Sequence, residues 1–218
     1  MAESHVASAV AHQFEDSEQQ QEAASLGMWV FLATEVMFFG GLFASYAIYR
    51  YLHRAGFEAG SHHLNVTIGA INTAVLICSS LTMALAVRAA QLGKRKSLMA
   101  FLASTMVLGL VFIFIKLAIE WRHDYLEGLA PGVNFTFAGL HAKSIEMFFV
   151  FYFSMTGVHA LHMVIGEGIL ATLLVLAWKG RFGPSHYNAV ETSGLYWHFV
   201  DIVWIFLFPL LYLIGGRY

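Results

Sequence analysis

Ionisable side chains lie within long apolar segments of this sequence, where each of them needs a physical reason to be. A charged group at the centre of a membrane helix costs about 2.5–3.5 kcal/mol on insertion scales, so such a group usually has a partner or a function. A buried acid can carry a proton, two histidines can ligate a metal or haem, and a lysine can neutralise an acid. The candidates are Glu35, Lys116, Glu120, His159, His162, Glu167, Glu191, His198 and Asp201.

Glu35 lies inside the first apolar segment, in the run TEVMFF at residues 34–39. A lone carboxylate in such a place should face the interior of a helix bundle. Two interpretations stay open: an acid that conducts or senses protons, and a neutral carboxylic acid that hydrogen-bonds two helices together.

Lys116 and Glu120 are four residues apart, which places them on one face of a helix. We expect a structural ion pair in which the two groups share the cost of burial. Glu120 and His123 also form an E-x-x-H pattern, but a di-iron bundle needs two such patterns on facing helices and further acids. No metal site is predicted from this pattern.

His159 and His162 are three residues apart in the run TGVHALH and share a helix face. Such a pair could ligate a metal or haem, although a bis-histidine haem usually takes its ligands from two different helices. Interhelical hydrogen bonding or contact with a lipid headgroup is the favoured alternative. For Glu167, in the same segment, a structural partner and a proton site are both open.

The last apolar segment begins at Glu191 and contains the run YWHFVD at residues 196–201. The spacing of Glu191, His198 and Asp201 places them roughly along one helix face, and His198 and Asp201 are close enough to hydrogen-bond directly. With Trp197 they are expected to form a polar scaffold that locks this helix to its neighbours. A Ser/His/Asp hydrolase is excluded, because no serine lies in the strand-to-helix elbow that such enzymes use.

The composition indicates what holds these residues in place. Of the 218 residues, 58% are apolar or aromatic and 12% are charged, and the mean hydropathy is +0.65. A soluble globule and a disordered chain both need more polar residues than this. Cys78 is the only cysteine, which excludes a disulfide scaffold, and a net charge of −2 without a basic segment argues against nucleic-acid binding.

We therefore expect an all-α integral membrane protein, a bundle of five transmembrane helices separated by the charged segments. Residues 1–25 form a polar, acidic N-terminal tail with solvated histidines at His5 and His12, and 26–218 form a single transmembrane domain. Residues 124–140 are expected to be a loop. The spans are predicted at about 26–49, 64–87, 98–121, 144–178 and 191–214.

The orientation follows from the basic residues in the loops. The side that carries the N-terminus holds six Lys and Arg against five on the other side, and four of the six lie in or beside one short loop. The positive-inside rule then places the N-terminus in the cytoplasm and the C-terminus outside. The basic residues of this loop are Arg88, Lys94, Arg95 and Lys96.

Sequence patterns for a bound cofactor are missing. The sequence has no phosphate-cradling glycine loop, no C-x-x-C and no Cys/His/Met copper set. These features favour a subunit of a larger complex over a self-sufficient enzyme. A free-standing transporter or channel is the rival, because of the carboxylates within the spans.

Four motifs in order resemble subunit III of haem–copper terminal oxidases. The run ETSGLYWHFVDIVW at residues 191–204 resembles the last helix of that family, and TGVHALHMVIG at 156–166 resembles its T-G-x-H-x-L-H-x-x-x-G helix. EVMFF at 35–39 is similar to its E-V-x-F-F helix, which carries a buried glutamate, and Glu120-Trp121 lies where the family has E-Y. The resemblance covers about residues 26–215.

The resemblance implies a non-catalytic subunit of cytochrome c oxidase in the bacterial cytoplasmic (inner) membrane. The subunit would bind no haem or copper itself, since partner subunits carry both, and it would bind phospholipid. It would pack against catalytic subunit I, with subunit II in the same complex, and support proton uptake and the durability of an enzyme that reduces oxygen and pumps protons. A quinol oxidase, the related nitric oxide reductase accessory subunit and membership of a respiratory supercomplex stay open.

The chain departs from the longer family members, which have seven helices. It lacks the first two, which in those members stand apart and enclose a lipid-filled cleft. Whether helices of a partner replace this pair, and which lipids bind, is left open by the sequence.

Overall fold

The computed structural model describes residues 17–184 and 186–215, and these residues are mostly helical, with residues 127–141 as the longest connection between helices. The helices are α1 (Ser17–Leu52), α2 (Arg54–His63), α3 (Val66–Gln91), α4 (Arg95–Phe114), a π-helix η1 (Ile115–Trp121), α5 (Arg122–Leu126), α6 (Ala142–Trp178) and α7 (Asn188–Tyr212). No named strand occurs within the described residues.

Five helical segments are long and apolar enough to cross a membrane, which confirms the predicted fold class. The first 16 residues of the expected acidic tail, with His5 and His12, lie outside the described residues. Residues 17–25 of that tail belong to α1, so the first helix extends further than its apolar part. The expected loop at 124–140 begins as helix, because α5 continues to Leu126.

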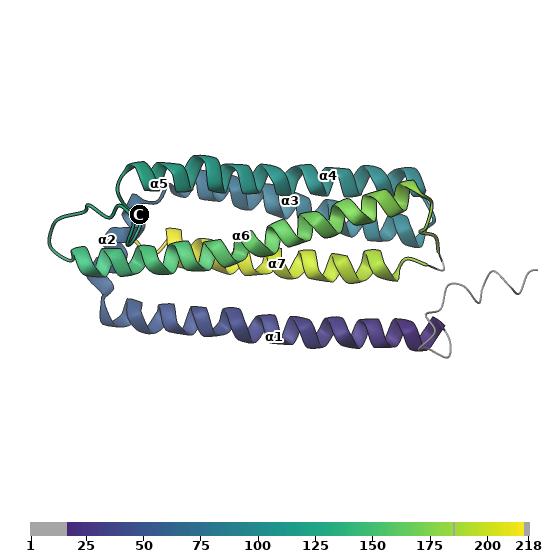
Figure 1. Cartoon of the computed structure of the whole chain (residues 1–218), viewed down its shortest axis with the longest axis horizontal. Helices are drawn as coiled ribbons and strands as arrows, with labels where there is room; N and C mark the ends of the chain where they lie inside the picture. Colours follow the sequence, from purple (N-terminus) through teal and green to yellow (C-terminus); the bar gives the residue numbers. More distant parts are fainter. Residues whose placement is uncertain (1–16, 185, 216–218) are drawn as a thin grey trace, which may run out of the picture.

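Four of the long helices form a ring. α3 packs against α4 and α7, and α6 packs against the same two helices. α1 lies outside this ring, beside α7 and α6 (Figure 1). In the most apolar part of each helix, 6% of the residues of α1 are buried inside the chain, against 50% for α7. α1 therefore presents most of its apolar surface to whatever surrounds the bundle.

Local sequence features determine several helix ends. Asn65 caps α3, since its side-chain oxygen accepts hydrogen bonds from the backbone N–H groups of Thr67 and Ile68. At the other end, Gly93 has a φ of +66°, a conformation that favours glycine and turns the chain into α4. Arg95 then donates to the carbonyls of Ala177 and Trp178, so its positive charge lies at the C-terminus of α6.

The π-helix η1 was not expected from the sequence, which predicted one regular helix up to residue 121. Its wider turns lie between α4 and α5 and contain Lys116 and Glu120, both buried. π-Helical turns inside α-helices are frequent at functional sites.

Glycines let α6 approach the largest side chain of the core. Trp197 of α7 is fully buried, and its ring lies against the backbone of α6 at Gly166 and of α4 at Gly109. A Cβ atom added at Gly166 would lie 2.8 Å from the ring of Trp197, whereas one added at Gly168 would meet nothing within 4 Å. The same helix thus carries one glycine required by packing and one that is not.

We predict that Gly166→Ala destabilises the protein by about 1–3 kcal/mol, the usual cost of overpacking against a rigid neighbour. Gly168→Ala is the matched control and should be neutral or stabilising by up to about 1 kcal/mol, because alanine is the better helix former. Thermal unfolding in detergent, followed by circular dichroism, measures both. A Gly166→Ala protein that melts at or above the temperature of the unaltered protein would contradict the packing described here.

Candidate functional site

The most heavily buried charge is Lys116 of η1, which is 1% exposed. Its Nζ donates to Glu120 Oε2 at 2.5 Å, to the Tyr212 hydroxyl at 2.5 Å and to the Tyr152 hydroxyl at 3.1 Å. The Tyr212 hydroxyl in turn donates to Glu120 Oε2 at 2.8 Å. The structure thus places the expected Lys116–Glu120 pair in a network that joins η1 to α6 and α7.

Asp124 extends this network and was missed by sequence reasoning, which placed it in a loop. Its side chain is buried, one helical turn beyond Glu120, and Oδ2 of Asp124 and Oε1 of Glu120 have no hydrogen-bond partner in the structure. Both residues line a small cavity of about 70 Å³ together with Tyr152 and Tyr212. The four-residue spacing from Glu120 was the signal that could have found it.

Glu35 of α1 lies beside His162 of α6, a pairing that the sequence did not indicate. The distance between His162 Nε2 and Glu35 Oε2 is 3.2 Å, and the other ring nitrogen, Nδ1, lies 2.8 Å from the Val158 carbonyl. A carbonyl only accepts, so Nδ1 carries a hydrogen. With Nδ1 engaged in this way, a hydrogen bond between Nε2 and Glu35 needs a proton on one of these two groups.

His159 does not share the surroundings of His162, although both were expected on one helix face. His159 is fully buried, with its ring against Trp204 and Phe112, and neither ring nitrogen has a hydrogen-bond partner. Glu167, further along α6, also has two carboxylate oxygens without a partner, beside Gly109. No group of three or more His, Cys, Asp or Glu within the described residues is arranged to hold a metal ion.

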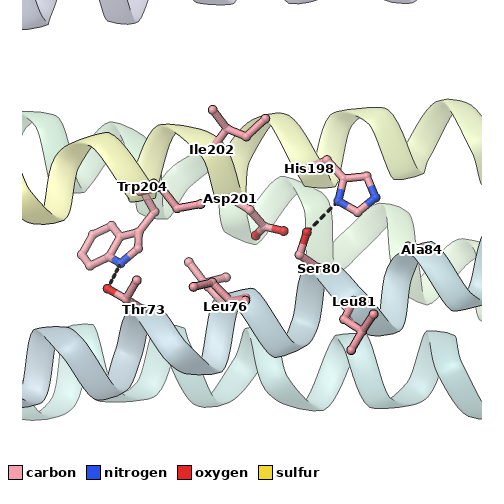
Figure 2. A pocket seen from close by; sticks show the side chains of 11 residues that line it. Thr73, Leu76, Ser80, Leu81, Ala84, His198, Asp201, Ile202 and Trp204 are labelled. Atoms are coloured by element: carbon pink, nitrogen blue, oxygen red, sulfur yellow. Dashed lines mark hydrogen bonds between the residues drawn. The ribbon is translucent and has the colours of Figure 1, made fainter.

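The polar residues of α7 are linked through α3 rather than directly to each other. Ser80 Oγ lies 2.7 Å from His198 Nδ1, and the Asp201 side chain points to the other side of Ser80 (Figure 2). The expected direct His198–Asp201 hydrogen bond is not formed, because Ser80 takes the place between them. Glu191 is exposed at the start of α7, two helical turns from His198, and lies apart from this group.

The tryptophans of α7 provide two further links to α3. Trp197 Nε1 donates to Ser79 Oγ at 3.1 Å, and Trp204 Nε1 donates to Thr73 Oγ1 at 3.0 Å. Both indoles therefore satisfy their single donor while their rings fill the core. This arrangement is a polar scaffold along the α3–α7 contact, and it includes Trp197.

Known proteins are similar to this chain over most of its length. The sequence model of a family described as cytochrome c oxidase subunit III matches residues 5–216. Cytochrome c oxidase subunit 3 of Corynebacterium diphtheriae is 34% identical over 192 residues, 87% of each chain. Cytochrome bo(3) ubiquinol oxidase subunit 3 of Pseudomonas aeruginosa is 30% identical over 214 residues, 97% of this chain and 96% of the relative. The probable quinol oxidase subunit 3 of Staphylococcus epidermidis is 31% identical over 199 residues, 90% and 92% of the two chains.

We predict that Lys116→Met costs about 3–5 kcal/mol of stability, because it leaves the buried Glu120 carboxylate without its counter-charge. The double variant Lys116→Met/Glu120→Leu should lose less than Lys116→Met alone, since no uncompensated charge is then buried. Unfolding in mixed detergent micelles, followed by circular dichroism, gives the three free energies.

The control for this prediction is the exposed pair of Arg54 and Glu58, 2.7 Å apart outside the long helices. Its hydrogen bond raises the pKa of the Arg54 guanidinium, but solvent screens the pair, so Arg54→Ala should leave the stability unchanged. A double variant that loses as much stability as Lys116→Met alone, or more, would show that the two side chains do not compensate each other.

Proposed function

Since the chain belongs to the cytochrome c oxidase subunit III family, we propose that it stabilises the catalytic subunit of a haem–copper oxygen reductase and supports proton uptake by that subunit. The chain is subunit III of a haem–copper oxidase and a multi-pass bacterial membrane protein. On this proposal the haem and copper that reduce oxygen are held by partner subunits. On the same proposal, residues of this chain connect its helices by hydrogen bonds, and the pair of Glu35 and His162 takes part in proton uptake.

The observation that carries the proton-uptake part is the contact between Glu35 and His162. The hydrogen bond of Nδ1 to the Val158 carbonyl leaves Nε2 and the carboxylate to share one proton. A pair that shares one proton can release it and take up another, which is the step that proton uptake requires. Glu35 lies on α1, the helix that the rest of the chain covers least.

The partners follow from the same family. We propose that this chain contacts catalytic subunit I, with subunit II in the same complex, and that phospholipid covers much of the apolar surface of α1. We further propose that the N-terminal side of the bundle faces the cytoplasm, on the strength of the basic loop between α3 and α4. Membership of a respiratory supercomplex is compatible with this arrangement.

The electron donor is proposed to be cytochrome c. The similarity to the Corynebacterium subunit supports this choice, while the similarity to the Pseudomonas ubiquinol oxidase subunit supports a quinol as the alternative. The accessory subunit of a nitric oxide reductase is the third candidate. Other subunits bind the donor, so the whole complex has to be tested.

We predict that the chain, purified in a mild detergent from its native membrane, brings haem-containing polypeptides with it. The complex should consume oxygen with reduced cytochrome c, the proposed donor. The isolated chain should not, because partner subunits bind the donor. Optical spectra of the haem and oxygen-electrode assays with cytochrome c and with a quinol measure this. A chain that purifies alone would contradict the proposed function, and oxygen consumption with a quinol alone would move the assignment to the quinol oxidases.

We predict that Glu35→Gln and Glu35→Ala have different effects on that complex. The Gln amide can still donate to His162 Nε2, so the complex should assemble normally, but it cannot release a proton, so proton uptake should slow. Glu35→Ala loses the interhelical hydrogen bond as well, worth about 0.6–1.7 kcal/mol in a membrane, and should also lower the yield of complex.

Glu58→Gln is the matched control, because it removes an exposed acid from the neighbouring helix. Proton uptake is followed with a pH-sensitive dye in liposomes that contain the complex. Uptake by Glu35→Gln at the rate of the Glu58→Gln control would leave Glu35 with a structural role alone.

A further inference from the structure

A groove of about 350 Å³ runs along the contact between α3 and α7 (Figure 2). Its walls are apolar side chains of both helices, among them the exposed Leu81 and Ile202. Its polar lining residues are Thr73, Ser80, His198 and Asp201. The Thr73 hydroxyl already donates to the Gly69 carbonyl and accepts from Trp204 Nε1. The groove therefore combines an apolar entrance with a group that can form hydrogen bonds.

The hydrogen-bonding capacity of this group is not met within the chain. Asp201 is 3% exposed, and neither carboxylate oxygen has a hydrogen bond of ordinary geometry, although Ser80 lies next to it. Ser80 has a single hydroxyl hydrogen and already lies 2.7 Å from His198 Nδ1. Even a hydroxyl turned to Asp201 would serve one oxygen and leave the other without a donor. In either protonation state the buried carboxyl group thus keeps at least one oxygen without a partner, which is costly in an apolar environment.

The depth of the group restricts what can supply this partner. Ser80 and Asp201 both lie near the middle of their helices, at least about 16 Å from either end at 1.5 Å per residue. A hydrocarbon core about 30 Å thick would place them close to its midplane. Phospholipid headgroups lie at the membrane surface, and acyl chains carry no hydrogen-bond donor. A transmembrane helix of another chain can carry a donor at this depth.

We propose that the α3–α7 groove seats a transmembrane helix of another subunit of the oxidase, which brings a hydrogen-bond-donating side chain to Asp201 at mid-membrane. A hydroxyl, amide, indole or imidazole group would serve. The volume suits one or two side chains of the partner, and the apolar walls suit the rest of its face. The inference rests on the proposed function, because it needs a complex with other membrane-spanning chains, and it adds the face and the chemistry of the contact.

Photocrosslinking in the intact complex tests which molecule lies in the groove. Benzoylphenylalanine is placed at Leu81, and at Val107 of α4 as a control that is exposed but does not line the groove. We expect the probe at Leu81 to form adducts with a membrane-spanning segment of another subunit, identified by mass spectrometry, in higher yield than the probe at Val107. Adducts of the Leu81 probe with lipid alone, or no excess over Val107, would overturn the proposal.

Variants test the hydrogen bond and the groove separately. Asp201→Leu removes the acceptor and should increase the loss of the chain during detergent washing by about threefold to about twentyfold, the range for one interhelical hydrogen bond in a membrane. Asp201→Asn keeps an acceptor oxygen and should stay close to the unaltered complex. Ile202→Trp should release the chain by filling the groove, without altering Asp201. The readout is the amount of this chain per haem.

Retention of Ile202→Trp and Asp201→Leu at the unaltered level would overturn the proposal. The two levels of inference fail in different ways. If no haem-containing polypeptide accompanies the unaltered chain, the proposed function fails. If haem-containing subunits accompany it but the Leu81 probe reaches no polypeptide, the function stands and the assigned face is wrong.

Discussion

An ionisable group within a membrane bundle must find its hydrogen-bond partners on the neighbouring helices, and the packing of this chain depends on that requirement. Lys116 meets it by donating to residues of three elements, Glu120 on η1, Tyr152 on α6 and Tyr212 on α7. Apolar side chains in lipid do not distinguish one apolar neighbour from another, so they cannot select these contacts. The hydrogen bonds of Lys116 therefore select which helices lie together, and the fully buried rings of Trp197 and Trp204 pack closely between helices.

The sequence predicted those features that depend on a single helix. The hydropathy profile predicted five spans, and the four-residue spacing of Lys116 and Glu120 predicted that they would share a face. It did not predict the π-helix, whose wider turns have no simple sequence signature and are formed where these two residues are buried. The sequence also predicted a loop at Asp124, because a segment that contains glycine and proline follows it. In the structure Asp124 lies in the helix α5.

The sequence did not predict which residues of different helices contact one another, because these contacts depend on the order of the helices around the ring. Glu35 and His162 are separated by 127 positions, and Ser80 and His198 by 118. The sequence therefore left the roles of Glu35 and His162 open without indicating that the two lie side by side. The neighbours of the two histidines also differ: His162 lies within hydrogen-bond distance of an acid, whereas His159, three positions earlier, is enclosed by aromatic rings.

The buried polar groups fall into two kinds, and the difference bears on how the chain works. Lys116 and the two tryptophan N–H groups are satisfied within the chain, so they can serve the fold of the isolated subunit. Asp201 is not satisfied and borders a groove that opens beside exposed apolar side chains, while α1 leaves most of its apolar surface uncovered. Both features carry a free-energy cost that neighbouring molecules can relieve. A chain with such unsatisfied outer contacts has the physical character of a subunit whose final stability is reached within a complex.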